Sequence, residues 1–239
     1  MVAVPELPDD VAGYAARVAD AGYFEAAAFT ADDAKRREQY ALNRERRASA
    51  DAATDMPTFL RSLEMVMQAQ PISRVDLARV TQLTNKTNQF NLTTRRYTES
   101  DIERFMADPA AVTLQIRLAD RFGDNGLISV LVARPDPEWP DDALLIDTWL
   151  MSCRVLGRQV EEATLGCLVC AARASGARAL IGAYRPTAKN AMVAQHYAKL
   201  GFESLPSRPG TPDGTTFWRL DLASYQPPAH FINIQEPAA

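Results

Sequence analysis

The order of strands and helices in the C-terminal half constrains the fold more than any other feature of the sequence. Three successive stretches have strand character and are separated by turn-rich segments: AVTLQIRLAD, GLISVLVARP and DALLIDTWLM. A helix through about Ser175, ended by Gly176, is followed by a strand, a helix and a last strand: ARALIGAYR, AKNAMVAQHYAKLG and TTFWRLDL. Three successive strands favour antiparallel pairing, whereas a strand-helix-strand unit implies a parallel crossover. We therefore expect an α/β fold with a mixed central sheet and flanking helices.

The first 70 residues have helical character. Three segments carry helix patterns or helix start signals: DDVAGYAARVADAGYF, TADDAKRREQYALNRERRASADAA and DMPTFLRSLEMVMQA. Two more helices are expected after them, one capped by Ser73 and one with capping-box spacing from Thr98 to Asp101. On this basis we divide the chain into a helical region, residues 1–70, and an α/β domain, residues 71–239.

Charge and apolar patterning argue against two kinds of partner. The 239 residues carry a net charge of -4, and the arginines are scattered, so nucleic acid is not expected as a partner. No apolar run approaches the roughly 20 residues needed to cross a membrane, and the first residues lack the pattern of a signal peptide. Three cysteines, an odd number in a large chain, argue against a disulfide framework. We expect a cytoplasmic protein.

Cys167 and Cys170 have the C-x-x-C spacing of a redox or metal half-site. Both lie in the expected helix VEEATLGCLVCAARA, without a second cysteine pair or a nearby histidine. We interpret them as core residues and expect no metal ion.

Two local patterns carry a resemblance to a fold family. The turn after the third strand reads Arg-Val-Leu-Gly-Arg-Gln over residues 154–159, and a second pattern is N-A…Y…GF at Asn190, Ala191, Tyr197, Gly201 and Phe202. With the order of elements, these residues resemble the GNAT acyltransferase superfamily, which has Gly or Ala where this chain has Gln159. The resemblance implies a GNAT-like mixed sheet and a site for the phosphate of an acyl thioester.

Three longer segments are similar to the carboxy-terminal portion of FkbH-like proteins: QLTNKTNQFNLTTRRYTESDI, LMSCRVLGRQVEEA and PTAKNAMVAQHYAKLGF. Members of that family act in polyketide biosynthesis and carry an upstream HAD-type phosphatase domain, whose nucleophile motif this sequence lacks. Residues 1–70 resemble the tail and linker of that domain. The resemblance implies transfer of a small hydroxyacyl, glyceryl-type group to the phosphopantetheine thiol of an acyl carrier protein. A separate HAD-type phosphatase domain would be a second partner, and phosphatase activity is not expected of this chain.

The turn at residues 154–159 is the candidate phosphate site. Backbone N–H groups at a helix start bind anions, and a glycine lets the backbone approach them closely. Charge-assisted contacts from the two arginines and crowding of a coenzyme A diphosphate by the glutamine are further expectations. The residues assigned to a phosphopantetheine arm or a coenzyme A thioester are Arg154, Val155, Leu156, Gly157, Arg158, Gln159 and Asn190. The alternative is an ordinary strand-to-helix turn with solvent-facing arginines.

Cys153 stands one residue before this turn, at the end of the third expected strand. A thiol at this position could accept the acyl group as a thioester, with its pKa lowered by the helix dipole and by Arg154. If no bulge intervenes, alternation places Cys153 on the same strand face as Asp147, which we include in the candidate pocket. The alternative is a small buried residue that closes a strand.

Tyr197 and His196 are the candidate acid and base. The resemblance implies that Tyr197 protonates the departing thiolate. His196 has the ordinary pKa best suited to a general base near neutral pH. Because helix neighbours point about 100° apart, both side chains cannot face one cleft, and we favour Tyr197.

The run TNKTNQFNLTT is rich in amides and hydroxyls. Such side chains suit hydrogen bonds to a polar acyl group, and the candidates are Asn85, Asn88, Gln89 and Asn91. The alternative is that they cap a helix and satisfy local backbone groups.

Three functions fit these observations. The first is transfer of a hydroxyacyl group to a carrier-protein thiol, and the second is acetyl-coenzyme A-dependent N-acetylation. The third is a non-catalytic module that docks a carrier protein.

Overall fold

The computed structural model describes residues 8, 10–15, 17, 31–208, 210–212 and 214–235. The chain divides into two compact units, residues 1–45 and 46–239, and helix α2 (Ala31–Ala52) contains the boundary. In the first unit, the carboxylate of Asp10 caps the 3-10 helix η1 (Val11–Gly13) by accepting a hydrogen bond from the Ala12 N–H. Most of the helix expected over residues 9–24 lies outside the described residues.

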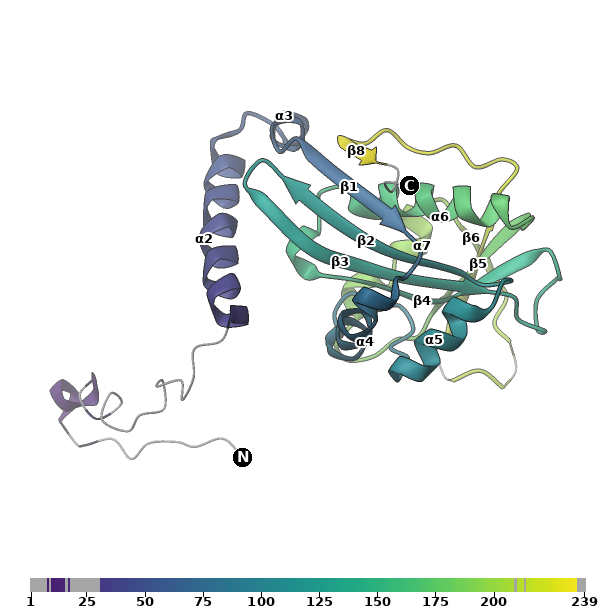
Figure 1. Ribbon diagram of the computed structural model, residues 1–239, viewed down its shortest axis with the longest axis horizontal. Coiled ribbons are helices and arrows are strands. Elements are labelled where there is room, and N and C mark those ends of the chain that lie inside the picture. Colours follow the sequence, from purple (N-terminus) through teal and green to yellow (C-terminus); the bar gives the residue numbers. More distant parts are fainter. Residues whose placement is uncertain are drawn as a thin grey trace. The chain divides into compact units, whose positions relative to one another are not determined.

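The second unit is built on an eight-stranded mixed sheet with the order β6-β7-β5-β4-β3-β2-β1-β8 (Figure 1). The strands are β1 (Met65–Gln70), β2 (Val112–Asp120), β3 (Gly123–Arg134), β4 (Ala143–Met151), β5 (Ala179–Tyr184), β6 (Glu203–Leu205), β7 (Thr216–Asp221) and β8 (Ile232–Gln235). β4 pairs with β5 and β1 with β8 in parallel, and the other neighbours are antiparallel. The predicted mixed α/β sheet is therefore confirmed, including the parallel crossover after three antiparallel strands.

Helices cover both faces of this sheet (Figure 1). They are α3 (Met56–Ser62), α4 (Leu77–Lys86), α5 (Glu99–Ala107), α6 (Val160–Ala174) and α7 (His196–Lys199), with the 3-10 helices η2 (Arg74–Asp76), η3 (Cys153–Val155) and η4 (Ala191–Val193). Alternating side chains of the central strands build two cores, because Leu131 and Trp149 pack beneath α6 whereas Val130 and Leu150 pack beneath α4 and α5. Among the helices described, none is both long and apolar enough to cross a membrane.

Two expected helices differ from the structure. The helix expected over residues 55–69 ends at Ser62, because Glu64 adopts a left-handed φ of 51° and the chain then continues as β1. Met65 and Met67 alternate into the core from this strand. The helix expected over residues 188–201 is divided into η4 and α7. The capping box at the start of α5 is confirmed, and the Ser73 cap belongs to η2, which leads into α4.

β4 and β5 separate part-way along their length. They pair over residues 143–146 and 179–182, and β4 then continues to Met151 without β5 beside it. Residues 90–93, named here the 90–93 segment, fill the gap with hydrogen bonds to both sides. Those bonds run from Leu92 N–H to Trp149 O (3.1 Å), from Met151 N–H to Phe90 O (3.0 Å) and from Arg185 N–H to Leu92 O (2.9 Å).

Candidate functional site

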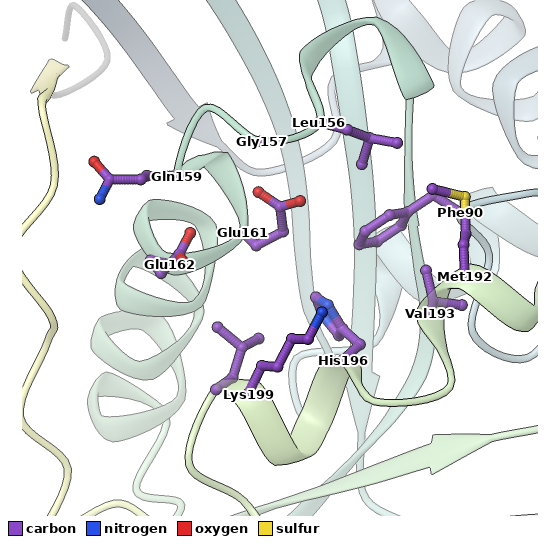
Figure 2. Close-up of a pocket in the computed structure, with 11 residues that line it drawn as sticks. Phe90, Leu156, Gly157, Gln159, Glu161, Glu162, Met192, Val193, His196 and Lys199 are labelled. Carbon is purple, nitrogen blue, oxygen red and sulfur yellow. The ribbon is translucent and has the colours of Figure 1, made fainter. Parts of the chain in front are cut away.

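A cavity with a volume of about 360 Å³ lies between the N-terminal turn of α6 and the η4–α7 segment (Figure 2). Its walls come from the 90–93 segment, the turn before α6, the first turn of α6, and η4 with α7. The lining residues are Phe90, Leu156, Gly157, Gln159, Glu161, Glu162, Met192, Val193, His196, Lys199 and Leu200. A mostly apolar wall thus surrounds a few ionisable groups, which is the usual composition of a small-molecule site.

The first turn of α6 brings backbone N–H groups to the edge of this cavity. Gln159 is the N-cap residue with a left-handed φ of 63°, and its side chain makes no capping bond to the helix. The first intrahelical bond runs from the Ala163 N–H to Gln159 O, at 3.2 Å. The N–H groups of residues 160–162 therefore lack carbonyl acceptors within the helix, although that of Glu161 is bonded to its own carboxylate. Unpaired N–H groups at a helix start, with the helix dipole, attract anions. Gly157 leads into the helix with a φ of 73°, a conformation that favours glycine.

His196 forms the inner wall of the cavity and is buried, with 7% of its surface exposed. Its ring packs edge-on against Phe90 and Trp149, with ring centroids 5.0 and 4.4 Å away. Burial, and to a lesser degree the charge of Lys199, lowers the pKa of His196 to about 3. The imidazole is therefore neutral at physiological pH. Its Nε2 atom has no hydrogen-bond partner among the described residues, and a buried polar atom of this kind is costly unless a bound molecule pairs with it.

Glu161 and Glu162 bring two carboxyl groups to the same cavity from α6, and Lys199 reaches it from α7 (Figure 2). Burial raises the pKa of Glu161 to about 7, against the opposing effects of a backbone hydrogen bond and of Lys199. Within the described part of the chain, Oε2 of Glu162 is buried without a partner. A carboxyl group with a pKa near neutrality exchanges protons readily at physiological pH, which is the property of a general base.

The sequence patterns did not identify three ionisable residues of the cavity wall, Glu161, Glu162 and Lys199, or the aromatic residue Phe90. Glu161 and Glu162 stand in the first turn of α6, where acidic residues are favoured by the helix dipole for structural reasons alone. Their residue type therefore gave no signal. The N-A…Y pattern had already drawn attention to the segment that contains Lys199.

The two arginines of the turn point away from the cavity. Nη1 of Arg158 pairs with Asp120 at 3.2 Å, and its Nη2 donates to Arg154 O at 2.8 Å. Arg154 donates to Ser152 Oγ at 3.1 Å and to Asn125 O at 3.3 Å. Both guanidinium groups are thus used inside the fold, neither lining the cavity nor extending freely into solvent.

The other residues of the turn are divided between core and cavity. Val155 is fully buried in the core beneath α6, whereas Leu156, Gly157 and Gln159 line the cavity. Oε1 of Gln159 accepts a hydrogen bond from the Phe231 N–H at 3.2 Å, and Figure 2 shows the side chain at the margin, directed away from Glu161. The glutamine therefore ties the segment before β8 to this turn.

The cysteines lie outside the cavity lining. Cys153 is the first residue of η3 and is exposed. Cys167 is partly buried against the core, and burial raises its pKa to about 11. Cys170 is exposed, which corrects the expectation that both cysteines of the pair are core residues. The inward face of α6 is instead formed by Leu168, Val169 and Ala172.

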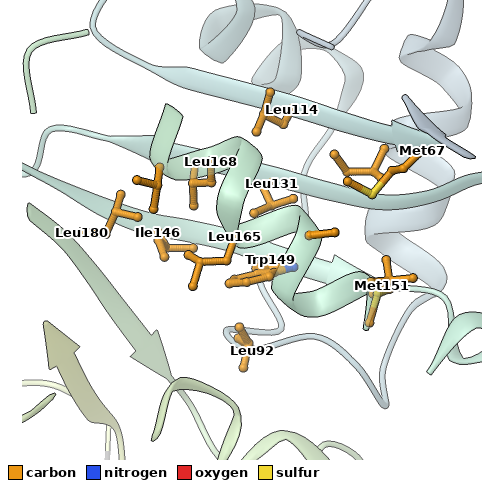
Figure 3. Packing of buried hydrophobic residues seen from close by; sticks show 14 of the residues in the cluster. Met67, Leu92, Leu114, Leu131, Ile146, Trp149, Met151, Leu165, Leu168 and Leu180 are labelled. Atoms are coloured by element: carbon orange, nitrogen blue, oxygen red, sulfur yellow. The ribbon is translucent and has the colours of Figure 1, made fainter. Parts of the chain in front are cut away.

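A β-bulge separates Asp147 from the face of β4 that carries Trp149. The register between β3 and β4 shifts by one residue at this point, so the expected alternation does not extend across it. Trp149 and Met151 lie in the core beneath α6 (Figure 3). The buried carboxylate of Asp147 instead accepts hydrogen bonds from Arg95, Tyr97 and Arg134. The condition under which Asp147 and Cys153 were expected to share one face is therefore not met, and Asp147 does not line the cavity.

The amide-rich run is mostly bonded to its own backbone. Three of the candidate side chains bond backbone groups of residues 86–97: Asn85, Asn88 and Asn91. Gln89 is exposed. These four side chains do not line the cavity, whereas Phe90, which stands among them in the sequence, does.

Tyr197 belongs to the core. Its side chain is 1% exposed, and its ring packs on Gly182 of β5. Burial raises the pKa of Tyr197 above its ordinary range. His196 and Tyr197 face different surroundings, as helix geometry predicts, but the structure places His196 in the cavity wall and Tyr197 in the core.

Asn190 holds the 90–93 segment in place. Its fully buried amide donates to Asn91 O and Arg185 O, at 2.9 Å each, and accepts from the Thr187 N–H at 2.7 Å. Asn190 does not itself line the cavity. It acts on the cavity through the position of the 90–93 segment, because that segment carries Phe90.

In the portion of the chain that is described, no three His, Cys, Asp or Glu side chains are grouped so as to hold a metal ion.

Neither a protein-family model nor a curated protein matches the sequence. Among solved structures, a protein from Desulfovibrio desulfuricans assigned to the GNAT family of acetyltransferases matches with a TM-score of 0.50 at 14% identity, over 66% of this chain and 99% of its own. The GNAT domain of S. lividans PAT matches with a TM-score of 0.48 at 16% identity, over 64% and 89%. The structure of yncA from Salmonella typhimurium with its cofactor acetyl-CoA matches with a TM-score of 0.48 at 17% identity, over 69% and 99%. The likeness to the D. desulfuricans protein shows that this chain has the GNAT fold, as its element order and its turn predicted.

Proposed function

We propose that the α/β unit is an acyltransferase that takes its acyl group from a pantetheine thioester, with acyl-coenzyme A as the first donor to test. The observation that carries this proposal is one cavity that joins the N-terminal turn of α6 to Glu161 and to the unpaired Nε2 of His196. The GNAT fold, shared with a protein assigned to an acetyltransferase family, supports the reaction class.

The turn before α6 suits the phosphate end of such a donor, and the region near His196 suits its thioester end. Gly157 and the N–H groups of residues 160 and 162 would hold a phosphate at the turn. The apolar side chains of Leu156, Val193 and Leu200 would contact the uncharged arm. The bound thioester supplies an activated acyl carbon, and the ionisable residues near His196 would act on the nucleophile that attacks it.

Glu161 is the proposed proton acceptor. With a pKa of about 7, its carboxylate is present at neutral pH and can take a proton from an attacking amine, hydroxyl or thiol group. The acyl carbon–sulfur bond of the donor then breaks, and the protonated Glu161 returns the proton to the departing thiolate. The ammonium of Lys199 favours that ionised form. His196, with a pKa of about 3, is a weak base. We therefore assign its Nε2 atom to a hydrogen bond with the reacting group.

We propose further that the phosphopantetheine thiol of an acyl carrier protein accepts the acyl group and that this group is a small hydroxyacyl group of the glyceryl type. Glu161 and Glu162 place negative charge beside the turn, while Arg154 and Arg158 are turned away. This arrangement favours a single phosphate over the diphosphate of coenzyme A. The carboxylates and the imidazole are also suitable partners for the hydroxyls of such an acyl group. Removal of phosphate from a phosphorylated precursor would belong to a separate HAD-type domain.

The proposed reaction is direct and does not pass through Cys153, because that thiol is exposed and outside the cavity lining. Cys153→Ala is therefore expected to retain the wild-type rate. Covalent acylation of the wild-type chain that is lost in Cys153→Ala, measured by intact mass, would instead support a thioester relay.

The test incubates the purified chain separately with acetyl-coenzyme A, an S-acyl phosphopantetheine and an acylated carrier protein, each with amine, alcohol and thiol acceptors. Thiol release gives the rate, and intact mass gives the acylated product. Transfer to amines from acetyl-coenzyme A would favour N-acetylation, and transfer to or from the carrier would favour the carrier reaction. Carrier binding without turnover of any donor would overturn the catalytic proposal and support a docking module.

Glu161→Gln tests the proposed base, with Glu99→Gln on α5 as a matched control at an exposed position. We expect Glu161→Gln to lower kcat/KM by about 100-fold or more, as for loss of a general base. Wild-type kcat/KM should fall as pH decreases through about 7, because Glu161 becomes protonated. A wild-type rate and pH profile in Glu161→Gln would contradict the assignment.

A further inference from the structure

The gap between β4 and β5 is closed by the 90–93 segment, and this closure has a consequence for the cavity. The segment lies beside the part of β4 that β5 has left, and it is bonded to Trp149 and Met151 on one side and to Arg185 on the other. Asn91 also forms an antiparallel bridge with Leu150. The sheet is thus continuous in hydrogen bonding across the position where two of its strands diverge.

Side chains fix the segment from both ends. Asn190 donates to Asn91 O, and the hydroxyl of Thr93 donates to Asp147 O at 2.9 Å. The backbone groups of Trp149 and Met151 that face the gap are occupied by these contacts. An arm that enters the cavity therefore finds no free edge of β4 at this level, and the side chains of the cavity must orient it.

Phe90 is the side chain that this segment presents to the cavity. It is 3% exposed, it lines the cavity, and it packs edge-on against His196. Its backbone carbonyl accepts the hydrogen bond from Met151, so the main chain from which the ring projects is fixed by the closure. The cavity volume of about 360 Å³ lies near the lower end of the range for ligand sites, roughly 300–1,000 Å³, so little room remains beyond the arm itself.

We infer that Phe90 sets the depth of the acyl end of the cavity and restricts the donor to short acyl groups of about two or three carbons. The inference rests on the proposed function. The ring stands at the wall formed with His196, which is where the reacting end of the donor is placed by that proposal. Asn190 is a positioning residue for this selection, because it holds the backbone from which Phe90 projects.

The experiment compares kcat/KM for acetyl, butyryl and hexanoyl thioesters of coenzyme A and of pantetheine in the wild type and in Phe90→Ala. Each methylene that an apolar pocket accepts or rejects is worth about tenfold in discrimination. We expect the wild type to prefer acetyl over hexanoyl. In Phe90→Ala the hexanoyl-to-acetyl ratio should rise by at least about tenfold. The hexanoyl-to-acetyl ratio of kcat/KM is the readout because it isolates chain-length selection. Loss of the contact between Phe90 and His196 would lower the rates for all donors together and leave that ratio unchanged.

Phe105→Ala on α5 is the matched control, because it removes a partly buried phenyl ring that packs on Tyr97 under the opposite face of the sheet. Its ratio should equal that of the wild type. Should Phe90→Ala fail to fold, Phe90→Leu provides a smaller enlargement and an intermediate ratio. If the wild type turns over thioesters and the folded Phe90 variant has the same hexanoyl-to-acetyl ratio of kcat/KM, the inference is overturned and the proposed function stands. If the wild type turns over no thioester, both the inference about Phe90 and the proposed function are overturned.

Discussion

Gly182 lies in the middle of β5, directly under the ring of Tyr197. A Cβ atom at this position would lie 2.5–2.6 Å from three carbon atoms of the ring. Gly182 is not among the residues with a positive φ, so alanine is compatible with its backbone and the conflict is one of space alone. The ring itself is 1% exposed and is packed against Phe202, with a centroid separation of 4.9 Å. Gly182→Ala therefore forces a buried ring to move in a place with little room.

The size of the effect follows from that distance. Ordinary contact between a Cβ and a neighbouring carbon begins at 3.4 Å, so the ring or the strand must shift by nearly 1 Å. Adding one methyl group to a packed core costs about 1–3 kcal/mol, and we expect about 3 kcal/mol here because several ring atoms conflict at once. The same shift displaces His196, whose ring lies next to that of Tyr197, so the cavity wall should be disturbed as well.

The assay is urea unfolding at neutral pH, with the free energy of unfolding taken from the transition. Gly166→Ala on α6 is the matched control, because a Cβ there meets no atom within 4 Å. Removing a glycine from a helix interior should stabilise the chain by about 0.5–1 kcal/mol. The two Gly→Ala substitutions thus have opposite expected signs. A Gly182→Ala chain as stable as the wild type would refute the packing of Tyr197 against β5.

Three other substitutions give separable results. Asn190→Ala should lower the free energy of unfolding by about 1–3 kcal/mol in urea, because one buried and one partly buried carbonyl group lose their donor; an unchanged midpoint would show that Asn190 does not anchor the 90–93 segment. Asp147→Asn should cost about 1–3 kcal/mol by the same assay, since it removes a buried carboxylate that accepts charged hydrogen bonds from two partly exposed guanidinium groups; an unchanged free energy of unfolding contradicts this. For His196, whose folded pKa is lowered from 6.5 to about 3, the unfolded chain binds more protons below pH 6.5, so stability is lost as pH falls through that range. Between pH 7 and 5, the free energy of unfolding of the wild type should therefore drop by about 2 kcal/mol more than that of His196→Gln. Glu161 has the opposite effect on stability, but it is present in both chains and cancels in this comparison. Parallel plots of unfolding free energy against pH would refute a buried neutral imidazole.

Most of the sheet could be predicted because its signals are local. The three strands from β2 to β4 are bounded by turn-rich segments, and the α6 crossover is bounded by Gly157 and Gly176, both with positive φ. For β1 the sequence pattern predicts the continuation of a helix, because its six residues follow α3 closely and its strand character depends on pairing with β2. β8 gave no signal for a similar reason, since its exposed residues pair only with β1.

The location of the candidate site was predictable, but its chemistry was not. The turn before α6 and the segment after β5 were marked by their sequence patterns, and both line the cavity. Which side chains enter it depends on a one-residue bulge in β4 and on the insertion of the 90–93 segment beside that strand. Neither is visible in periodicity, because a bulge resets the alternation and the inserted segment is an irregular loop.

Asn190 and His196 show why residue type alone points to the wrong side chains. A polar residue suggests a ligand contact only if the fold leaves it without a partner, and the four hydrogen-bonding positions of an amide are readily used by backbone groups. Asn190 is fully buried and is bonded to two carbonyl groups and one N–H, so nothing in its surroundings calls for a ligand. His196 is almost as buried, yet its Nε2 atom is unpaired among the described residues and faces a wall that contains Glu161. The indole nitrogen of Trp149 is also unpaired in the described part of the chain, yet it lies in the core. An unpaired buried nitrogen therefore points to a substrate contact where its residue also lines the cavity, as His196 does, because a bound group can then recover the lost hydrogen bond.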